Sequence, residues 1–549
     1  MESGGKELEA EIRPLKKEAE VVAGERAEIG AAKKAGRLSR WRTAAFFLSL
    51  FLCLTVVFAF SFIIPCPVRP ISQRAWRRVY ADAATYKFLE VQDVDQDRVQ
   101  DILFAFKASD SSYNNSTNRS CFGEGFTSPC AFIAAISGTN GSTLWEEPVA
   151  QDLQLMDCSF EYDNSQGCLV VGELASLAVI DLKTGKTVWR VRTSLRANST
   201  VLSPLLKVPD VNGDGVSDLL VFVATGEEIQ SGFYSGNSGD RIGSGGSLHL
   251  PGRIGHLMHT TKAGAYYVLF YTANALYGYS LRKLYTMAAG SDDHGGTGLK
   301  EDPRWETVID SSTHYVPLLS SGEIRYLMKV PGRSGTDILL VRSTTLELLD
   351  GQRLGSLWTT DVVPHIQSEP VLGSYDADEI DIVIESRVSP NRKKILIVEG
   401  SSGNIRWDLV LLSGTGTPAP ATLATADHRS LFLFWGDYQP GDNRTGSEGA
   451  PQNLYLFHPS FHNVLLWMTN STEAIVAFEA VLFERSRHAC YVLLTGPQTN
   501  SSPGLVVLSK QKLKEDMASS QVIWLNQLAQ DTDQNIRDRF LRMRYRSPW

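Results

Sequence analysis

Three stretches of this chain share one spacing between a turn glycine and a tryptophan, and this repeat constrains the fold more than any other feature. They are Ile136–Trp145, Ile180–Trp189 and Val398–Trp407, each an apolar run, a polar turn with glycine, and a Trp four residues after that glycine. Weaker copies lie at Tyr234–Gly239, Leu349–Trp358 and Leu456–Trp467, and two without Trp lie near 276–284 and 505–513. Such repetition indicates a fold built by stacking similar units.

The repeat predicts small antiparallel sheets arranged radially as a β-propeller. The turn positions, near 141, 185, 239, 283, 353, 403, 463 and 512, are 44 to 70 residues apart, and a propeller blade takes about 40–50 residues, with loop insertions adding the excess. A closed ring buries both faces of each sheet and leaves only short edges. We therefore expect an all-β domain over residues 80–549 with eight blades, or seven as the alternative, in which the Trp side chains pack between neighbouring blades.

A second motif places oxygen-bearing side chains at relative positions 1, 3, 5 and 9 of two loops, each followed at once by an apolar run. In loop 1 they are Asp93, Asp95, Asp97 and Asp101, and in loop 2 they are Asp210, Asn212, Asp214 and Asp218. Ca²⁺ accepts about six to eight such oxygen ligands. The pattern predicts Ca²⁺ as a cofactor, and the alternative is an Asx-type turn held by hydrogen bonds without an ion.

The two loops are not equally suited to a cation. Loop 2 has Gly215 at the sharp turn, where loop 1 has Arg98, whose side chain disfavours a left-handed turn and whose charge competes with the ion. We therefore expect loop 2 to bind better. An EF-hand is not expected, because a strand follows each loop and no Glu stands at the twelfth position. Degenerate copies of the loop lie at Lys329–Asp337 and Tyr375–Asp381.

Residues 44–64 form an uncharged run of 21 residues that ends at Pro65. As a helix this run reaches about 31 Å, enough to cross the hydrocarbon core of a bilayer. A buried core helix and a cleaved signal peptide are the alternatives, and both are usually shorter. The sequence therefore predicts a disordered cytosolic tail (1–43), a transmembrane helix (44–64) and a juxtamembrane stalk (65–79), so that the lipid bilayer is one partner.

Glycosylation acceptors give the orientation, since basic residues on the two sides of the span differ little in number. Eight Asn-x-Ser/Thr triplets follow the span and none precedes it. The acceptors are Asn114, Asn115, Asn118, Asn140, Asn198, Asn443, Asn470 and Asn500. This one-sided distribution predicts a type II membrane glycoprotein with its C-terminal region outside the cytosol. We expect it at the cell surface, with a secretory-pathway membrane as the alternative.

Cysteine positions agree with an oxidising compartment. Cys121 with Cys130, and Cys158 with Cys168, are close enough to close short disulfide loops, although spacing alone does not fix the pairing. Cys490 lies in an apolar stretch and is expected to be a buried thiol. Cys66, next to the predicted span and without a local mate, is a candidate for an intermolecular disulfide.

Loops 1 and 2 resemble the FG-GAP calcium loops of integrin α-subunit propellers, and the glycine–tryptophan turns resemble quinoprotein-like blades. Over nearly its whole length, including Leu8–Lys16, Ala45–Leu54 and Ile536–Phe540, the chain resembles the family with sequence similarity 234. The resemblance implies a type II single-pass membrane protein with an FG-GAP propeller. It implies no molecular activity.

The function classes narrow accordingly. A net charge of −8 lacks the basic excess of a nucleic-acid binder. The chain has no adjacent Cys-Cys pair, Gly-x-Ser-x-Gly elbow, His-Glu-x-x-His site or phosphate loop, and its close histidine pairs, His256/His259 and His458/His462, are better explained as strand or turn residues. We expect no catalytic residue and a non-catalytic propeller that binds a protein or serves as an accessory module. A quinoprotein-like or other luminal enzyme is the alternative.

Overall fold

The computed structural model describes residues 40–63, 75–109, 120–162, 165–173, 176–192, 199–290, 298–332, 335–362, 365–366, 368–377, 379–413, 416–439, 452–484, 488–526 and 531–547. The chain forms two units, Met1–Arg69 and Pro70–Trp549. The first contains one described helix, and the second contains all the described strands.

Helix α1 (Arg40–Ile63) is the described element of the first unit. Its side chains from Ala44 to Phe58 are exposed. Among the described residues, the structure has no helix that combines the length and the apolar character of a membrane span. The span predicted over 44–64 is therefore not confirmed. Most of the predicted tail (1–43) and stalk (65–79) lies outside the described residues.

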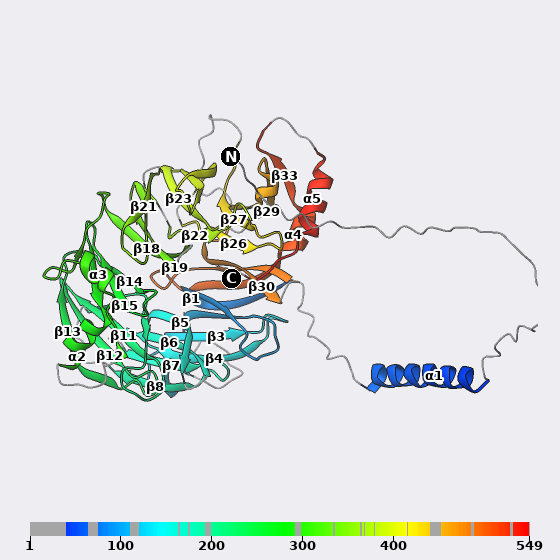
Figure 1. The fold of residues 1–549 in the computed structure, drawn as a ribbon, viewed down its shortest axis with the longest axis horizontal. Coiled ribbons are helices and arrows are strands. Elements are labelled where there is room, and N and C mark those ends of the chain that lie inside the picture. Colours follow the sequence, from blue (N-terminus) through cyan, green and yellow to red (C-terminus); the bar gives the residue numbers. More distant parts are fainter. Residues whose placement is uncertain are drawn as a thin grey trace, which may run out of the picture. The chain divides into compact units, whose positions relative to one another are not determined.

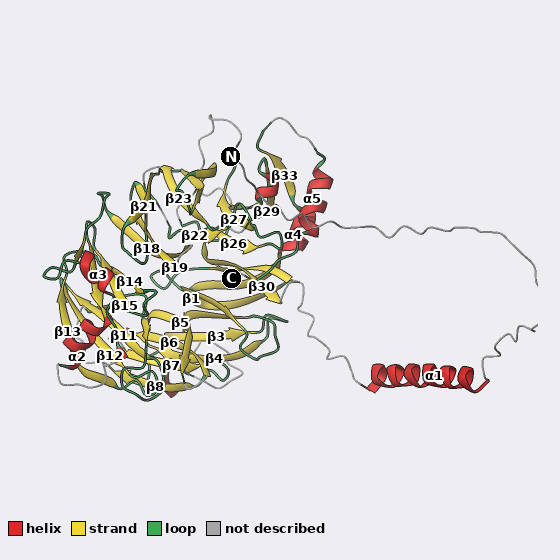
Figure 2. Ribbon diagram, in the orientation of Figure 1, coloured by secondary structure: helices red, strands yellow, loops and turns green. Residues whose placement is uncertain are grey.

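The described strands of the second unit form seven antiparallel sheets (Figures 1 and 2). The largest contains, in spatial order, β30 (Ile475–Glu484), β31 (His488–Thr495), β32 (Gly504–Lys512), β1 (Trp76–Gln92), β2 (Asp101–Ala108), β3 (Cys130–Ile136) and β4 (Thr143–Ala150). The next two are β5 (Leu153–Tyr162), β6 (Ser165–Gly172), β7 (Ser176–Asp181) and β8 (Thr187–Arg192), and then β10 (Leu206–Val208), β11 (Asp218–Thr225), β12 (Glu228–Tyr234) and β13 (Arg241–His249), with β9 (Thr200–Val201) beside β11.

Four further sheets complete the unit. They are β14 (Gly255–Thr260), β15 (Tyr266–Tyr271), β16 (Leu276–Ser280) and β17 (Tyr315–Val316); β18 (Ile324–Gly332), β19 (Gly335–Arg342), β20 (Thr345–Leu349) and β21 (Ser356–Asp361); β22 (Val371–Gly373), β23 (Asp381–Ser389), β24 (Arg392–Glu399) and β25 (Ile405–Leu412); and β26 (Ala421–Ala424), β27 (Ser430–Gly436), β28 (Gln452–Phe457), β29 (Val464–Ser471) and β33 (Gln521–Trp524). The short helices are η1 (Phe122–Glu124), α2 (Leu281–Ala289), α3 (Pro303–Val308), η4 (Pro459–Phe461), α4 (Leu513–Ser519) and α5 (Asp533–Arg542).

This arrangement is the predicted all-β, propeller-like fold. The sheets follow one another around a ring, so that β30 comes to lie beside β1 (Figure 1). Hydrophobic clusters lie between successive sheets: one of them joins Leu103 and Ile133 of the first sheet to Met156 and Val170 of the next. Each sheet therefore buries its faces against its neighbours, which is how small sheets become stable in a ring.

The long strand β1 belongs to two groups of four strands. Its first part, Trp76–Ala83, pairs with β32, and its second part, Ala83–Gln92, pairs with β2. The groups β30–β31–β32–β1 and β1–β2–β3–β4 thus share one strand. The pairing with β32 begins at Trp76, so the sheet includes the last residues of the predicted stalk (65–79). It also joins the beginning of the ring to its end.

The repeated tryptophans connect neighbouring sheets, as the repeat predicted. Trp145 of β4 donates a hydrogen bond from Nε1 to the carbonyl oxygen of Leu182 in the β7–β8 turn, at 2.8 Å. The same contact recurs from Trp76 to Gly138, from Trp189 to Gly236 and from Trp358 to Gly400. In each case the indole also lies against a turn glycine, and these glycines are Gly141, Gly185, Gly239 and Gly403. The contact of Trp76 with Gly141 lies within the largest sheet, and the other three join successive sheets.

Two predicted turns without Trp are wrong. Near 283 the chain forms helix α2 directly after β16, because Ser280 caps the helix by accepting the Lys283 N–H at 3.2 Å. The fourth strand of that sheet, β17, comes only at Tyr315. Near 512 the chain enters helix α4, since β1 supplies the neighbouring strand of β32.

Candidate functional site

Loop 1 (Asp93–Asp101) connects β1 to β2 and is held by its own aspartates. Asp101 is buried at the start of β2, where one carboxylate oxygen accepts the Val94 N–H and the other accepts the Gly138 N–H, both at 2.9 Å. Asp97 accepts the hydroxyl of Thr139 at 3.1 Å. The loop is thereby fixed both to its own strand and to the β3–β4 turn.

Three of the predicted ligands of loop 1 come together. Carboxylate oxygens of Asp93, Asp95 and Asp101 all lie within 4.8 Å of one another, the one such group of three His, Cys, Asp or Glu residues in the described part of the chain. Oδ1 of Asp93 is buried and has no hydrogen-bond partner, and a buried, unsatisfied oxygen is costly. These residues therefore fit a hard cation such as Ca²⁺, whereas Asp97 lies outside the group.

The surroundings also shift the acidity of loop 1. Burial raises the pKa of Asp93, and burial raises the pKa of Asp101 to about 7 in spite of the backbone N–H groups that Asp101 accepts. Both shifts disfavour the charged form when no cation is bound. A cation near these oxygens would act in the opposite direction.

Loop 2 (Asp210–Asp218) connects β10 to β11 with the same architecture. The Asp210 carboxylate accepts the N–H groups of Gly213 at 2.6 Å and Gly215 at 2.8 Å. Asp218 repeats the role of Asp101 by accepting the N–H groups of Val211 at 2.7 Å and Gly236 at 3.3 Å. These are the hydrogen bonds of an Asx-type turn, and Ca²⁺ binding in loop 2 stays a prediction.

Of the predicted ligands of loop 2, Asp210, Asn212 and Asp214 are exposed and Asp218 is buried. Asn212 donates to the Asp214 carboxylate at 3.1 Å, and Ser235 donates to it at 2.9 Å. Burial acts to raise the pKa of Asp214, but the hydrogen bonds from Val216, Asn212 and Ser235 outweigh it and lower this pKa. Burial raises the pKa of Asp218. Asp214 is thus held in its charged form, as a cation ligand requires.

Loops 1 and 2 have similar backbone conformations at the sharp turn, although one has Arg98 there and the other has Gly215. Gly215 has φ +86°, and Arg98 at the equivalent position of loop 1 has φ +72°. The N–H of Arg98 donates to Asp93 at 3.1 Å, just as the N–H of Gly215 donates to Asp210. Arg98 therefore adopts the left-handed conformation that its side chain disfavours, and its hydrogen bond to Asp93 helps to hold it there.

Both degenerate copies keep the last aspartate of the motif. Asp337, at β19, accepts the Gly351 N–H at 3.0 Å, as Asp101 does with Gly138. Asp381, at the start of β23, accepts the Tyr375 N–H at 2.6 Å. At these two positions the motif connects a strand to a nearby turn or loop, which is a structural role and needs no ion.

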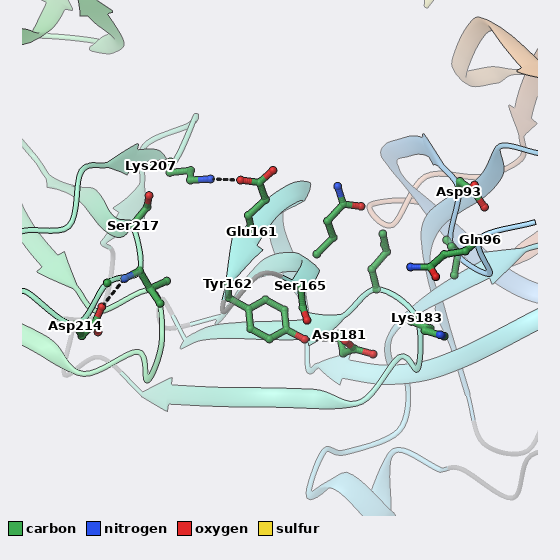
Figure 3. A pocket seen from close by; sticks show the side chains of 15 residues that line it. Asp93, Gln96, Glu161, Tyr162, Ser165, Asp181, Lys183, Lys207, Asp214 and Ser217 are labelled. Atoms are coloured by element: carbon green, nitrogen blue, oxygen red, sulfur yellow. Dashed lines mark hydrogen bonds and ion pairs between the residues drawn. The ribbon is translucent and has the colours of Figure 1, made fainter. Parts of the chain in front are cut away.

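A polar cavity of about 780 Å³ lies between loops 1 and 2. Asp93 and Gln96 border it on one side and Asp214 and Ser217 on the other, with residues of the β5–β8 sheet between them (Figure 3). Strands β5 and β6 are joined by only two residues, 163 and 164, with Tyr162 paired to Ser165. Tyr162 and Ser165, at the ends of these two strands, line the hollow between the two long loops.

The lining residues of this sheet were not predicted from the sequence. They include Glu161, Ser165, Gln166, Asp181 and Lys183. Asp181 and Lys183 lie in the repeat Ile180–Trp189, but nothing in the repeat marks them as binding residues, and the other three belong to no motif. The only signal was indirect: a short polar connection at 163–164 lies where the equivalent connections before β2 and β11 are long.

The close histidine pairs occupy structural positions. His256 Nε2 lies 2.7 Å from the Pro204 carbonyl oxygen, and His259 Nε2 lies 2.7 Å from the Gly351 carbonyl oxygen. Burial lowers the pKa of both to about 4. His458 is buried and caps η4 by accepting the Ser460 N–H at 3.2 Å. These contacts agree with strand and turn roles and assign no proton-transfer task to these histidines.

The predicted disulfides are present. Cys121 bonds to Cys130, and Cys158 bonds to Cys168. Cys490 is buried and is in neither disulfide. Cys66 lies outside the described residues.

Three predicted glycosylation acceptors are described, and all three are exposed: Asn140, Asn470 and Asn500. Asn114, Asn115, Asn118, Asn198 and Asn443 lie outside the described residues. The three described side chains can accept a glycan without unfolding of the sheet.

Comparison with solved structures gives weak likenesses. BamB from Moraxella catarrhalis is 11% identical with a TM-score of 0.41, and the match covers 79% of this chain and 98% of that one. A europium-containing methanol dehydrogenase is 9% identical with a TM-score of 0.43, over 80% and 93% of the two chains. At these scores the likeness supports no functional argument.

Sequence comparison is more informative. Residues 76–546 match the family described as FAM234A/B beta-propeller. Protein FAM234A of Homo sapiens is 46% identical, and that of Rattus norvegicus is 47% identical, each over 99% of both chains. Protein FAM234B of Gallus gallus is 30% identical over 88% of this chain and 79% of its own. The chain therefore belongs to the FAM234A/B β-propeller family, with its A members among its relatives.

Proposed function

We propose that this chain is a type II single-pass membrane glycoprotein whose propeller binds a protein partner without catalysis, at the cell surface. The single observation that supports the binding role is the hollow between loops 1 and 2, which is lined by polar side chains from three successive sheets. Rigid sheets that present several loops suit recognition. The relatives named above carry no enzymatic name.

The membrane part of the proposal rests on the sequence around α1. The run 44–64 has no charged residue, and all eight acceptor triplets follow it. We propose that α1 crosses the bilayer with residue 1 in the cytosol. The exposed acceptors Asn140, Asn470 and Asn500 support a non-cytosolic propeller.

Two finer points belong to the same proposal. The two four-stranded groups that share β1 count as separate blades, which gives a ring of eight. Loops 1 and 2 hold Ca²⁺, through Asp93, Asp95 and Asp101 in the first and through Asp210, Asn212 and Asp214 in the second. A resident ion would stiffen both borders of the hollow, because it links residues that are several positions apart in each loop.

Proximity labelling in intact cells tests the binding role. A peroxidase is fused to the C-terminus of the full chain and supplied with a biotin reagent that does not cross membranes. We expect a reproducible set of labelled membrane or extracellular proteins. A double variant of the hollow, Lys183→Ala with Asp214→Ala, should label only part of this set.

The matched control is Lys300→Ala with Asp361→Ala, which removes one exposed charge of each sign away from the hollow. It should label the same proteins as the unmodified chain. If the double variant of the hollow also labels the same set, the hollow is not the surface that binds the partner. If labelling occurs only with the enzyme at the N-terminus, the proposed orientation is wrong.

A further inference from the structure

The hydrogen bonds inside the hollow separate side chains that are already engaged from side chains that are not. Glu161 pairs with Lys207 at 2.8 Å. Asp181 accepts the hydroxyl of Tyr162 at 2.7 Å and the N–H of Thr184, also at 2.7 Å. These two carboxylates therefore already interact with other groups of the protein.

The carboxylate of Asp214 is also engaged. It accepts the Val216 N–H at 2.9 Å, the Asn212 amide at 3.1 Å and the Ser235 hydroxyl at 2.9 Å. Asp93 accepts the N–H of Arg98 at 3.1 Å and belongs to the cation group of loop 1. The acidic residues thus hold the walls of the hollow in place.

Four neutral side chains of the lining make no such contacts. The side chains of Gln96, Ser165, Gln166 and Ser217 line the hollow and have no hydrogen-bond partner among the described residues. Gln96 of loop 1, Ser165 of the intervening sheet and Ser217 of loop 2 are labelled in Figure 3, and Gln166 follows Ser165 in β6. Together they offer two amides and two hydroxyls, each of which both donates and accepts hydrogen bonds.

From this inventory we infer that the hollow binds a neutral saccharide. A sugar ring carries several hydroxyl groups that donate and accept at once, which is what amide and hydroxyl side chains on three sides of a cavity can satisfy. The volume of about 780 Å³ is suitable for a short oligosaccharide. The exposed ammonium of Lys183 supplies a further donor at the rim. This inference rests on the proposed binding role of the same face.

Other ligand classes fit less well. A lipid tail needs an apolar lining, and this lining is mostly polar and charged. A phosphate ligand would meet four carboxylates, those of Asp93, Glu161, Asp181 and Asp214, against the ammonium groups of Lys183 and Lys207. A lysine-rich peptide would have to compete with Lys207 for Glu161 and with the N–H and hydroxyl donors that Asp181 and Asp214 already accept. A neutral ligand avoids each of these costs.

Saturation-transfer difference NMR on the full chain in detergent micelles tests the inference. The probes are N-acetyllactosamine, mannotriose and maltotriose at millimolar concentration, with triethylene glycol as a ligand without ring hydroxyls. We expect transfer to at least one of the saccharides and none to triethylene glycol. Gln166→Leu should weaken the affinity about three- to tenfold, the effect of losing one hydrogen bond, and Ser217→Ala should weaken it similarly.

Gln521→Leu is the matched control, because Gln521 is also an exposed strand glutamine and lies on β33, outside the hollow. It should bind like the unmodified chain, and melting curves of all variants check that they are folded. Absence of transfer to all three saccharides, or equal binding by Gln166→Leu, Ser217→Ala and Gln521→Leu, overturns the inference. If labelling of partner proteins still depends on Lys183 and Asp214 in that case, the proposed function stands without a sugar.

Discussion

The indole of Trp145 lies against Gly185 of the following sheet, so close that a Cβ atom built on that glycine would be 2.7 Å from the ring. Gly185 also has φ +71°, a conformation that side chains disfavour. The glycine is thus required twice, once by its backbone and once by the neighbouring tryptophan. The same contact recurs between successive sheets at Gly239 and Gly403, and within the largest sheet at Gly141.

Gly185→Ala should lower the free energy of unfolding by about 2–4 kcal/mol, from the positive φ and from overpacking against Trp145. Gly226→Ala is the control, because Gly226 has φ +66° but no atom within 4 Å of a built Cβ. It should cost only about 1 kcal/mol. Denaturant unfolding of the full chain in detergent measures both. Equal losses would show that the indole moves aside at no cost.

Acidic pH should stabilise the propeller through two half-buried glutamates. Burial raises the pKa of Glu90 and Glu479 to about 7, and each is raised further by a neighbouring carboxylate, Asp157 for Glu90 and Glu90 for Glu479. In the unfolded chain these groups ionise near 4.5. Between about pH 4.5 and about pH 7 the folded state therefore holds more protons, and its stability falls as pH rises.

The measurement is the melting temperature of the full chain between about pH 5 and about pH 8, for the unmodified chain and for Glu90→Gln and Glu479→Gln. Each substitution should raise the melting temperature at the upper end and flatten the pH dependence attributable to its carboxyl. A steeper fall with rising pH in either variant would contradict the assignment.

Calcium should raise the melting temperature, and loop 2 should account for more of the rise. An ion bound only by the folded state at 100 times its Kd adds about 2.7 kcal/mol. Asp214→Ala should remove most of the effect and Asp97→Ala less, because Asp214 is a proposed ligand of loop 2, whereas Asp97, at the same position of loop 1, lies outside the carboxylate group of that loop. A melting curve that responds to neither Ca²⁺ nor a chelator would leave both loops as Asx turns. A larger loss with Asp97→Ala would favour loop 1.

Treatment with an N-glycosidase should lower the apparent mass of the full chain. The triple variant Asn140→Gln, Asn470→Gln, Asn500→Gln should show a smaller shift, because it removes the three exposed acceptors on described parts of the propeller. Absence of any shift in the unmodified chain would argue against the proposed topology.

The sequence indicated the sheets and their joints because those features are local. The spacing from Gly185 to Trp189 is fixed by one hairpin, and the same hairpin recurs along the chain. The turn expected near 283 is absent because Ser280 caps a helix, which forms there in place of a hairpin.

The hollow could not be predicted in this way. It depends on the short connection between β5 and β6 and on the long loops before β2 and β11. These three segments lie far apart in the sequence. Similarly, the left-handed conformation of Arg98 follows from the carboxylate of Asp93, a contact that residue preferences alone do not show.

The double pairing of β1 sets the order in which this molecule can be completed. Trp76–Ala83 is synthesised near the start of the propeller, but its partner Gly504–Lys510 is made near the end. Until then one edge of β1 lacks its neighbour, and an unpaired edge strand invites association with other chains. A nascent chain of this family therefore keeps its ring open during most of its synthesis, and a truncation before Gly504 would leave the seam without its second side.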